Sequence, residues 1–221
     1  PEIAIGNSIG SNIANIGLIF GVSCFFLSKS SLDINLRDVF LLILSVLLTG
    51  YILFDYKISN SESFILVAFF ILFVLHLLRQ KHEPTEDGSQ ESLSKIISLI
   101  IFSMVILVSG SELTVFGGTN LASILSVSNE IIGLTMIAIG TSLPELAASI
   151  SALRQKKGNM VIGNIIGSNI LNVVLIFPLI GFSTSFILDE LIFKRDFLMV
   201  CIYTSIFVVF ISLGDSKGLV K

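Results

Sequence analysis

The sequence predicts an all-α integral membrane protein with seven membrane-spanning helices. Of its 221 residues, 53% are hydrophobic and only 13% are charged, and the mean hydropathy is +0.96. A water-soluble domain usually carries about 25% charged residues, roughly twice this fraction. The charged residues lie between long apolar stretches, and one polar segment occurs twice along the chain. These observations together favour a bundle of membrane helices built from a repeat.

Seven apolar stretches are candidates for the membrane helices, and all but the fifth, which contains Glu145, lack Asp, Glu, Lys and Arg. A helix needs about 20 apolar residues to cross a hydrocarbon core of about 30 Å, and the second and third stretches reach this length only with their flanking residues. Backbone groups in lipid must be hydrogen-bonded within their own segment, so helices are expected here. The expected spans are 3–27, 39–54, 63–78, 96–111, 131–153, 160–182 and 197–213.

Positive charge is divided unequally between the two faces of the membrane. If successive connections alternate between the faces, one face receives ten Lys and Arg residues and the other receives three. The excess of Lys and Arg places the first face in the cytoplasm. The longest polar connection, residues 79–95, lies on this face, and we expect it to tether two halves of the protein.

Composition argues against several classes of function. With 13 Lys and Arg against 16 Asp and Glu, the chain offers no basic surface for a phosphate backbone, so no nucleic-acid partner is expected. No Ser/His/Asp set, Cys/His set or phosphate-binding loop is apparent, and we expect neither an enzyme nor a bound cofactor. Cys24 and Cys201 lie in apolar stretches and are interpreted as small buried hydrophobic residues.

The repeated segment lies on the first and the sixth expected spans. Residues 5–20 read IGNSIGSNIANIGLIF and residues 162–177 read IGNIIGSNILNVVLIF, with twelve of 16 positions identical at an offset of 157 residues. Because the first and sixth spans are an odd number of crossings apart, the two copies cross the membrane in opposite directions. Inverted repeats of this kind are typical of secondary transporters, whose substrate site lies near the bilayer midplane.

Each copy of the repeat carries a serine and an asparagine on one helix face. Ser11 and Asn15 are four residues apart, and so are Ser168 and Asn172. Their hydroxyl and amide oxygens are neutral ligands for a hard cation. Hydrogen bonding between helices is the alternative role for such residues in a membrane.

Two small-residue motifs accompany these polar faces. Gly6 and Gly10 in the first copy, and Gly163 and Gly167 in the second, leave the helix surface bare. We therefore expect another backbone to approach closely beside each motif.

A single carboxylate, Glu145, lies within the fifth expected span. A buried carboxylate in a membrane is costly unless it meets a cation or a partner; the alternative is that its side chain reaches the interface. Pro144 removes a hydrogen-bond donor near Gly140, so a broken helix with freed carbonyl oxygens is expected there. An oxygen-only set favours Na⁺ or Ca²⁺ over zinc or copper. The candidate oxygen ligands on this span are Ala138, Thr141, Ser142 and Glu145.

These motifs resemble the alpha-repeat signature of the sodium/calcium exchanger superfamily, the cation/Ca²⁺ antiporters. GTSLPE at residues 140–145 and GNxxGSNIxN at residues 6–15 and 163–172 carry the resemblance, which is closest to the bacterial ten-helix members. It implies an inverted-repeat transporter in which this chain supplies seven transmembrane helices of a ten-helix fold, the third to the ninth. The ion ligands implied by the resemblance are Ala138, Thr141, Ser142, Glu145, Ser168 and Asn172 in one repeat, with Ser11 and Asn15 in the other.

The resemblance also implies how the chain is divided. Residues 1–80 correspond to the C-terminal part of the first inverted repeat, 81–95 to the cytoplasmic central loop, and 96–221 to the second repeat without its last helix. The chain begins with Pro1, and the family's second GTSxPE motif would precede it, so we expect it to be part of a longer protein. Because Ca²⁺ affinity follows the charge of the ligands, transport is expected of the complete protein. Asn172, where some members carry Asp, leaves the ion preference and stoichiometry open.

Three functional hypotheses follow. The first is a secondary active cation antiporter of the inner (plasma) membrane that exchanges Ca²⁺ for Na⁺ by alternating access, both ions being transported rather than retained. The second is exchange of Ca²⁺ or another cation for H⁺, with Glu145 taking up the proton. The third, from another class, is an ion channel or a non-transporting membrane scaffold. The sequence leaves the counter-ion, the oligomeric state and the regulation open.

Overall fold

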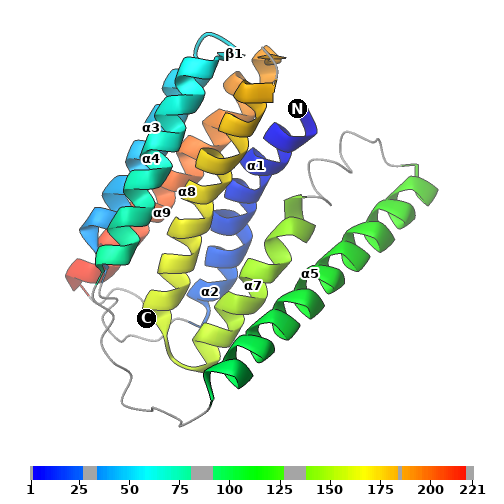
Figure 1. Cartoon of the computed structure of the whole chain (residues 1–221), viewed down its shortest axis with the longest axis vertical. Coiled ribbons are helices and arrows are strands. Elements are labelled where there is room, and N and C mark those ends of the chain that lie inside the picture. Colours follow the sequence, from blue (N-terminus) through cyan, green and yellow to red (C-terminus); the bar gives the residue numbers. More distant parts are fainter. Residues whose placement is uncertain (1, 27–33, 81–91, 127–137, 184–185, 218–221) are drawn as a thin grey trace.

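The computed structural model is a bundle of long helices, most of which lie side by side along its long axis (Figure 1). It describes residues 2–26, 34–80, 92–126, 138–183 and 186–217. In chain order the elements are α1 (Glu2–Ala14), the π-helix η1 (Asn15–Phe20), α2 (Gly21–Cys24), α3 (Leu36–Leu53), β1 (Lys57–Ile58), α4 (Asn60–Arg79), α5 (Leu93–Ile124), α7 (Ala138–Arg154), α8 (Gly158–Ser183), β2 (Phe186–Ile187), the π-helix η3 (Ile192–Phe197) and α9 (Leu198–Lys217).

The two copies of the repeat form α1 with η1, and the middle of α8. These elements pack against each other and run in opposite directions through the bundle (Figure 1). The inverted orientation predicted from the number of intervening spans is therefore confirmed in the arrangement of the helices.

Contacts at the two ends of the bundle agree with the predicted alternation of the connections. At one end, β1 and β2 pair antiparallel with Lys57 opposite Ile187, joining two connections that were assigned to the same face. At the other end, Asp38 Oδ1 at the start of α3 lies 2.6 Å from His76 Nε2 near the end of α4. This contact brings together the two connections that were assigned to the cytoplasmic face.

Five helices in the described part of the chain are long and apolar enough to cross a membrane by length and composition. They are Leu36–Leu53, Asn60–Arg79, Ser94–Leu121, Gly158–Ser183 and Ile192–Leu213. The first predicted span appears instead as three successive elements, α1, η1 and α2, that follow one another from Glu2 to Cys24. The fifth begins within residues that lie outside the described ranges, and its described part is the 17-residue α7.

Local signals explain where two of these helices begin. Ser59 precedes α4 and forms a capping box: its Oγ accepts from the Glu62 N–H at 3.4 Å, and its N–H donates to Glu62 Oε2 at 2.7 Å. Asn35 precedes α3, and its side-chain oxygen accepts from the Arg37 N–H at 3.1 Å. Each cap satisfies a backbone group that the first helical turn leaves unpaired, so both helices begin slightly before the purely apolar stretch.

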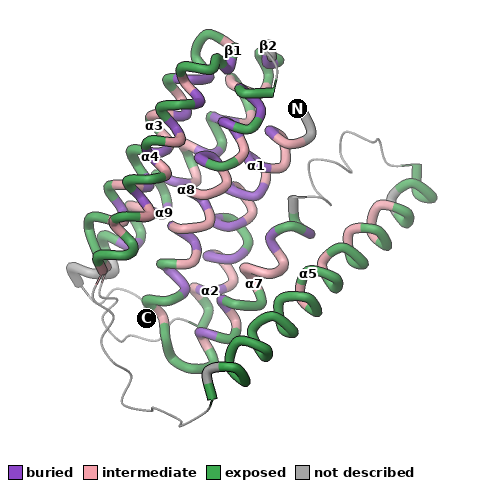
Figure 2. The backbone as a smooth tube through the Cα atoms, viewed as in Figure 1, coloured by how far each residue is buried: buried purple, intermediate pink, exposed green. Residues whose placement is uncertain are grey.

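Burial is concentrated on α1 and α8 and is lowest on α5 (Figure 2). In the most apolar part of each helix, 56% of α8 residues are buried inside the bundle but none of those on α5. The inner face of the repeat consequently forms the centre of the described structure. The apolar surface of α5 is consistent with a helix that faces lipid or other membrane helices.

Gly181 allows α8 to pack tightly against the start of α4 and against β1. A Cβ atom at this position would lie 2.0 Å from Ser63 Oγ and 2.8 Å from Ile58 Cγ2. We predict that Gly181→Ala lowers the free energy of unfolding by about 1–3 kcal/mol, because either helix must shift to admit the methyl group. Reversible unfolding in detergent micelles, followed by circular dichroism, measures this change.

The matched control for this substitution is Gly117→Ala on α5. A Cβ atom at Gly117 would meet no atom within 4 Å in the described structure. The control is not expected to lower the unfolding free energy, because alanine favours a helix by about 0.5–1 kcal/mol over glycine. Equal destabilisation by the two substitutions would contradict the packing described for α4 and α8.

Candidate functional site

A continuous polar face runs along the first copy of the repeat. Ser8 precedes Ser11 and Asn12 by three and four residues, and Asn15 follows them at the same spacings, so the four share one side of the helix. None of the four is more than 5% exposed, and the face is turned into the bundle. Buried polar side chains in such a position require partners, and α7 and α8 supply them.

The asparagines of the two copies form two pairs across the centre of the bundle. Asn172 Nδ2 donates to Asn12 Oδ1 at 2.9 Å, and Asn15 Nδ2 donates to Asn169 Oδ1 at 3.5 Å. At the repeat offset of 157 residues, Asn12 corresponds to Asn169 and Asn15 to Asn172. Each bond is therefore the counterpart of the other under the inverted symmetry, and both Asn15 and Asn172 lie where the copies meet.

The hydroxyls of Ser11 and Thr141 connect α1 to α7. Their oxygen atoms are 3.0 Å apart, and Thr141 Oγ1 also donates to Asn7 Oδ1 at 3.0 Å. Two of the predicted ligands, distant in sequence, are thus in direct contact.

Glu145 is placed between α7 and α8 through its backbone. Its carbonyl oxygen accepts from Asn164 Nδ2 at 3.2 Å, and the same amide lies 3.2 Å from Ser149 Oγ. The Glu145 side chain is half-buried. In the described part of the chain, no hydrogen bond joins its carboxylate to another predicted ligand.

Three buried oxygen atoms have no hydrogen-bond partner among the described residues. They are Asn15 Oδ1, Ser142 Oγ and Glu145 Oε2, each on a predicted ligand. Leaving a buried polar atom unpaired costs about 1–3 kcal/mol, and more when the group is charged. A cation ligand satisfies such an oxygen as well as a hydrogen bond does, so these three residues are the candidates for an ion site.

The chemistry of the cluster fits a hard cation. No group of three or more His, Cys, Asp and Glu side chains occurs in the described residues. The site instead combines neutral hydroxyl and amide oxygens with one carboxylate, the oxygen set that suits Na⁺ or Ca²⁺.

The remaining predicted ligands have less defined positions. Ser168 is half-buried on α8, one turn before Asn172, which is also half-buried. Ala138 is the first residue of α7, and its side chain lies outside the described residues. Neither is brought into a described contact with Glu145.

The helix changes its hydrogen-bonding pattern at a predicted ligand. Asn15 is the first residue of the π-helix η1, which extends to Phe20. Single turns of π-helix inside α-helices occur frequently at functional sites, because the extra residue re-aims the side chains around it.

The expected break at Pro144 is not present. α7 continues through Pro144 from Ala138 to Arg154. The carbonyl that this proline leaves unpaired, that of Gly140, accepts a hydrogen bond from Ser111 Oγ on α5. The freed oxygen therefore joins α7 to α5.

The close approach expected beside Gly163 and Gly167 is also not observed. A Cβ atom at either glycine would have no neighbour within 4 Å in the described part of the chain. In the described structure the surface of α8 at these glycines is therefore open.

Sequence reasoning missed Asn12 and Asn169, which bind the amides of Asn172 and Asn15. Both are buried, at 3% and 2% exposure. The sequence does single them out, because both copies of the repeat carry asparagine at this position. Their role was overlooked because spacing along one helix identifies a shared face but not the partner on another helix.

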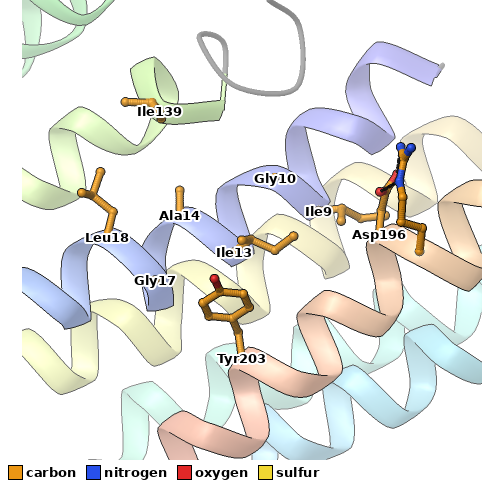
Figure 3. Close-up of a pocket in the computed structure, with 10 residues that line it drawn as sticks. Ile9, Gly10, Ile13, Ala14, Gly17, Leu18, Ile139, Asp196 and Tyr203 are labelled. Atoms are coloured by element: carbon orange, nitrogen blue, oxygen red, sulfur yellow. Dashed lines mark hydrogen bonds and ion pairs between the residues drawn. The ribbon is translucent and has the colours of Figure 1, made fainter. Parts of the chain in front are cut away.

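A separate groove of about 540 Å³ lies beside α1 (Figure 3). Its walls are mainly apolar, and the carboxylate of Asp196 at one end is paired with the Arg195 guanidinium at 2.7 Å. This pairing and the apolar lining make the groove a poor cation site. The lining residues are Ile9, Gly10, Ile13, Ala14, Gly17, Leu18, Ile139, Arg195, Asp196 and Tyr203.

We predict that Ser111→Ala destabilises the protein by about 1–3 kcal/mol, because it leaves the Gly140 carbonyl without a partner. In a Pro144→Ala background the residue at 144 regains an N–H that can bond to this carbonyl, so the effect of Ser111→Ala should largely disappear. Unfolding of the four proteins of this double-mutant cycle in detergent measures the coupling. Additive effects would show that Ser111 does not replace the bond lost at Pro144.

Comparison with known proteins places the chain in a family. The sequence profile described as sodium/calcium exchanger protein matches residues 1–79 and 95–217. The chain is 32% identical to inner membrane protein YrbG of Escherichia coli (strain K12), over 93% of this chain and 68% of that protein. It is 29% identical to sodium/calcium exchanger MaX1 of Methanosarcina acetivorans, over 96% of this chain and 73% of that protein.

Solved structures agree with this assignment. The fold matches the sodium-calcium exchanger NCX_Mj, soaked with zero Na⁺ and Ca²⁺, with a TM-score of 0.74 and 28% identity, over 99% of this chain and 72% of that one. The match covers both copies of the inverted repeat, and the five long apolar helices agree with a multi-pass membrane protein. The chain belongs to the sodium/calcium exchanger protein family.

Proposed function

We propose that the protein is a cation antiporter that exchanges Ca²⁺ for Na⁺ across the inner (plasma) membrane. The observation that carries this proposal is the set of three buried oxygen atoms without partners, those of Asn15, Ser142 and Glu145, beside two oppositely oriented helices. The proposed ion ligands are Glu145, Thr141, Ser142, Ala138, Ser168, Asn172, Ser11 and Asn15.

Each kind of ligand has a separate role in this proposal. Glu145 supplies negative charge, and the hydroxyls and amides supply neutral oxygens that complete the coordination shell. Ca²⁺ takes 6–8 oxygen ligands, so a cluster drawn from three helices suits it better than a site on one helix. Na⁺ competes for the same oxygens, and this competition couples the two fluxes.

The inverted arrangement provides the route for alternating access. Because α1 and α8 carry equivalent polar faces in opposite directions, a movement that opens the site to one side has a counterpart that opens it to the other. The relatives support this proposal, since MaX1 is named a sodium/calcium exchanger and another similar protein, CaxA of Alkalimonas amylolytica, a putative antiporter.

The inverted symmetry also suggests where further ligands join the site. Asn7 and Ser11 contact Thr141 on α7, and their counterparts on α8 are Asn164 and Ser168. The open surface beside Gly163 and Gly167 lies on the same stretch of α8. In this proposal a second GTSxPE segment of the complete protein packs there and adds a second carboxylate to the site.

Exchange of Ca²⁺ for H⁺ is the second candidate. It is favoured by the same buried and unpartnered Glu145 oxygen, because a proton satisfies this atom as well as a cation does. The two mechanisms differ in the gradient that drives uptake. Accumulation of Ca²⁺ that follows a pH gradient in the absence of Na⁺ supports the H⁺ mechanism.

We predict that Glu145→Gln lowers Na⁺-driven Ca²⁺ uptake by at least about tenfold, because the substitution removes the charge of the ligand set and keeps its shape. The full-length protein is reconstituted into vesicles loaded with Na⁺, and uptake of radioactive Ca²⁺ is followed after dilution into Na⁺-free buffer. Glu112→Gln is the matched control: Glu112 also lies within an apolar helix but is exposed on α5.

The control is expected to retain uptake within about twofold of the unmodified protein, a change of less than about 0.5 kcal/mol. If Glu145→Gln and Glu112→Gln behave alike, Glu145 does not belong to the ion site. Flux that neither saturates nor depends on a counter-ion indicates a channel.

A further inference from the structure

The asparagines of the repeat are not equivalent in what they donate and accept. In each pair, the last asparagine of one GNxxGSNIxN motif donates its amide hydrogen, and the preceding asparagine of the other motif accepts it. Asn172 donates to Asn12, and Asn15 donates to Asn169. This polarity is the same in both pairs, as the inverted symmetry requires.

An asparagine ligand has to present its oxygen to a cation. The amide group carries an acceptor on one side and two donor hydrogens on the other, and rotation about its last torsion angle exchanges them. An amide that turns its NH₂ group toward the ion site repels the cation. The free energy of binding therefore depends on what fixes the orientation of Asn15 and Asn172.

The paired asparagines fix this orientation by engaging the donor side. The NH₂ group of Asn172 is bound by Asn12 Oδ1, and that of Asn15 is bound by Asn169 Oδ1. The opposite side of Asn15, its Oδ1 atom, is buried and has no partner among the described residues. The bond to Asn169 thus engages the donor side of this amide and leaves its acceptor oxygen available to a cation.

We propose that Asn12 and Asn169 are positioning residues that hold the oxygens of Asn172 and Asn15 toward the transported cation. This inference rests on the proposed function, because it assumes that Asn15 and Asn172 bind the ion. Asn12 and Asn169 do not act as ligands themselves, since the side-chain oxygen of each is occupied by the opposite amide. They correspond to the second layer of residues that orients the ligands of metal sites.

In this arrangement, each copy of the repeat orients the proposed ligand on the other copy. Asn12 lies on α1 and orients a ligand on α8, whereas Asn169 lies on α8 and orients a ligand on η1. A displacement of α1 relative to α8 would break both bonds together. The side-chain oxygens of Asn15 and Asn172 would then lose their fixed orientation in the same movement.

The first test replaces the accepting asparagine by a residue of the same shape. We expect Asn12→Leu to raise the Ca²⁺ concentration for half-maximal uptake about tenfold, the loss typical when a ligand loses the partner that orients it. The maximal rate stays within about twofold. Na⁺-driven uptake of Ca²⁺ by the full-length protein in vesicles measures both quantities.

Two further variants separate loss of orientation from loss of folding. Asn12→Asp keeps the accepting oxygen, so the half-maximal Ca²⁺ concentration should not rise. Ser45→Ala removes a buried hydroxyl of α3 whose bond to the Leu42 carbonyl, at 2.7 Å, lies outside the site. This control should retain both kinetic constants of the unmodified protein.

The decisive measurement is a rescue in an Asn172→Asp background. A carboxylate presents oxygen on both sides and needs no partner to orient it, so Asn12→Leu should change the half-maximal Ca²⁺ concentration by less than about twofold there. The symmetric cycle combines Asn169→Leu with Asn15→Asp and should give the same result.

The possible outcomes distinguish this inference from the proposed function. If Asn12→Leu has the same effect in both backgrounds, the bond serves only to hold the helices together and the inference is wrong, while the antiporter proposal stands. The inference is also wrong if Asn12→Leu lowers the maximal rate and leaves the half-maximal Ca²⁺ concentration unchanged. If the unmodified protein does not move Ca²⁺, the proposed function fails and this inference fails with it.

Discussion

The structure depends on one constraint, that every polar group placed in the middle of a membrane bundle must find a partner there. The repeat places serine and asparagine on the most buried helices of the described chain. Two copies in opposite directions satisfy most of these groups mutually, as in the bonds of Asn12 with Asn172 and of Asn15 with Asn169. The antiparallel packing of α1 and α8 follows from this requirement as much as from apolar burial.

The buried polar atoms that lack a hydrogen-bond partner indicate where a ligand could bind. Of the four buried side-chain atoms without a partner among the described residues, three are oxygens on predicted ligands, and the fourth is the amide nitrogen of Asn169. In the proposed function these three oxygens belong to one cation site. One carboxylate adds charge to it without creating the dense acidic cluster of a permanently occupied metal site.

Much of this arrangement could be predicted from the sequence, and the failures have a physical reason. The spans and the inverted orientation follow from the apolar stretches and the repeat, and the family resemblance placed Ser11 and Thr141, which are in contact, in one set of ligands. The roles of Asn12 and Asn169 do not follow from the sequence, because they depend on how two helices are rotated about their axes. The positions of neighbouring helices also decide the outcome at Pro144 and Gly167. Pro144 frees the Gly140 carbonyl, which Ser111 of another helix binds, and the surface beside Gly167 is open.

The most direct test of the central claim is a crystal structure of the full-length protein grown with Ca²⁺ and measured for its anomalous scattering. We expect a peak about 2.3–2.6 Å from Asn15 Oδ1 and from a carboxylate oxygen of Glu145, the usual distances between Ca²⁺ and its oxygen ligands. In the same crystal, the amide hydrogens of Asn15 should still be directed at Asn169. A well-ordered Ca²⁺ ion that contacts neither Asn15 nor Glu145 would contradict the account.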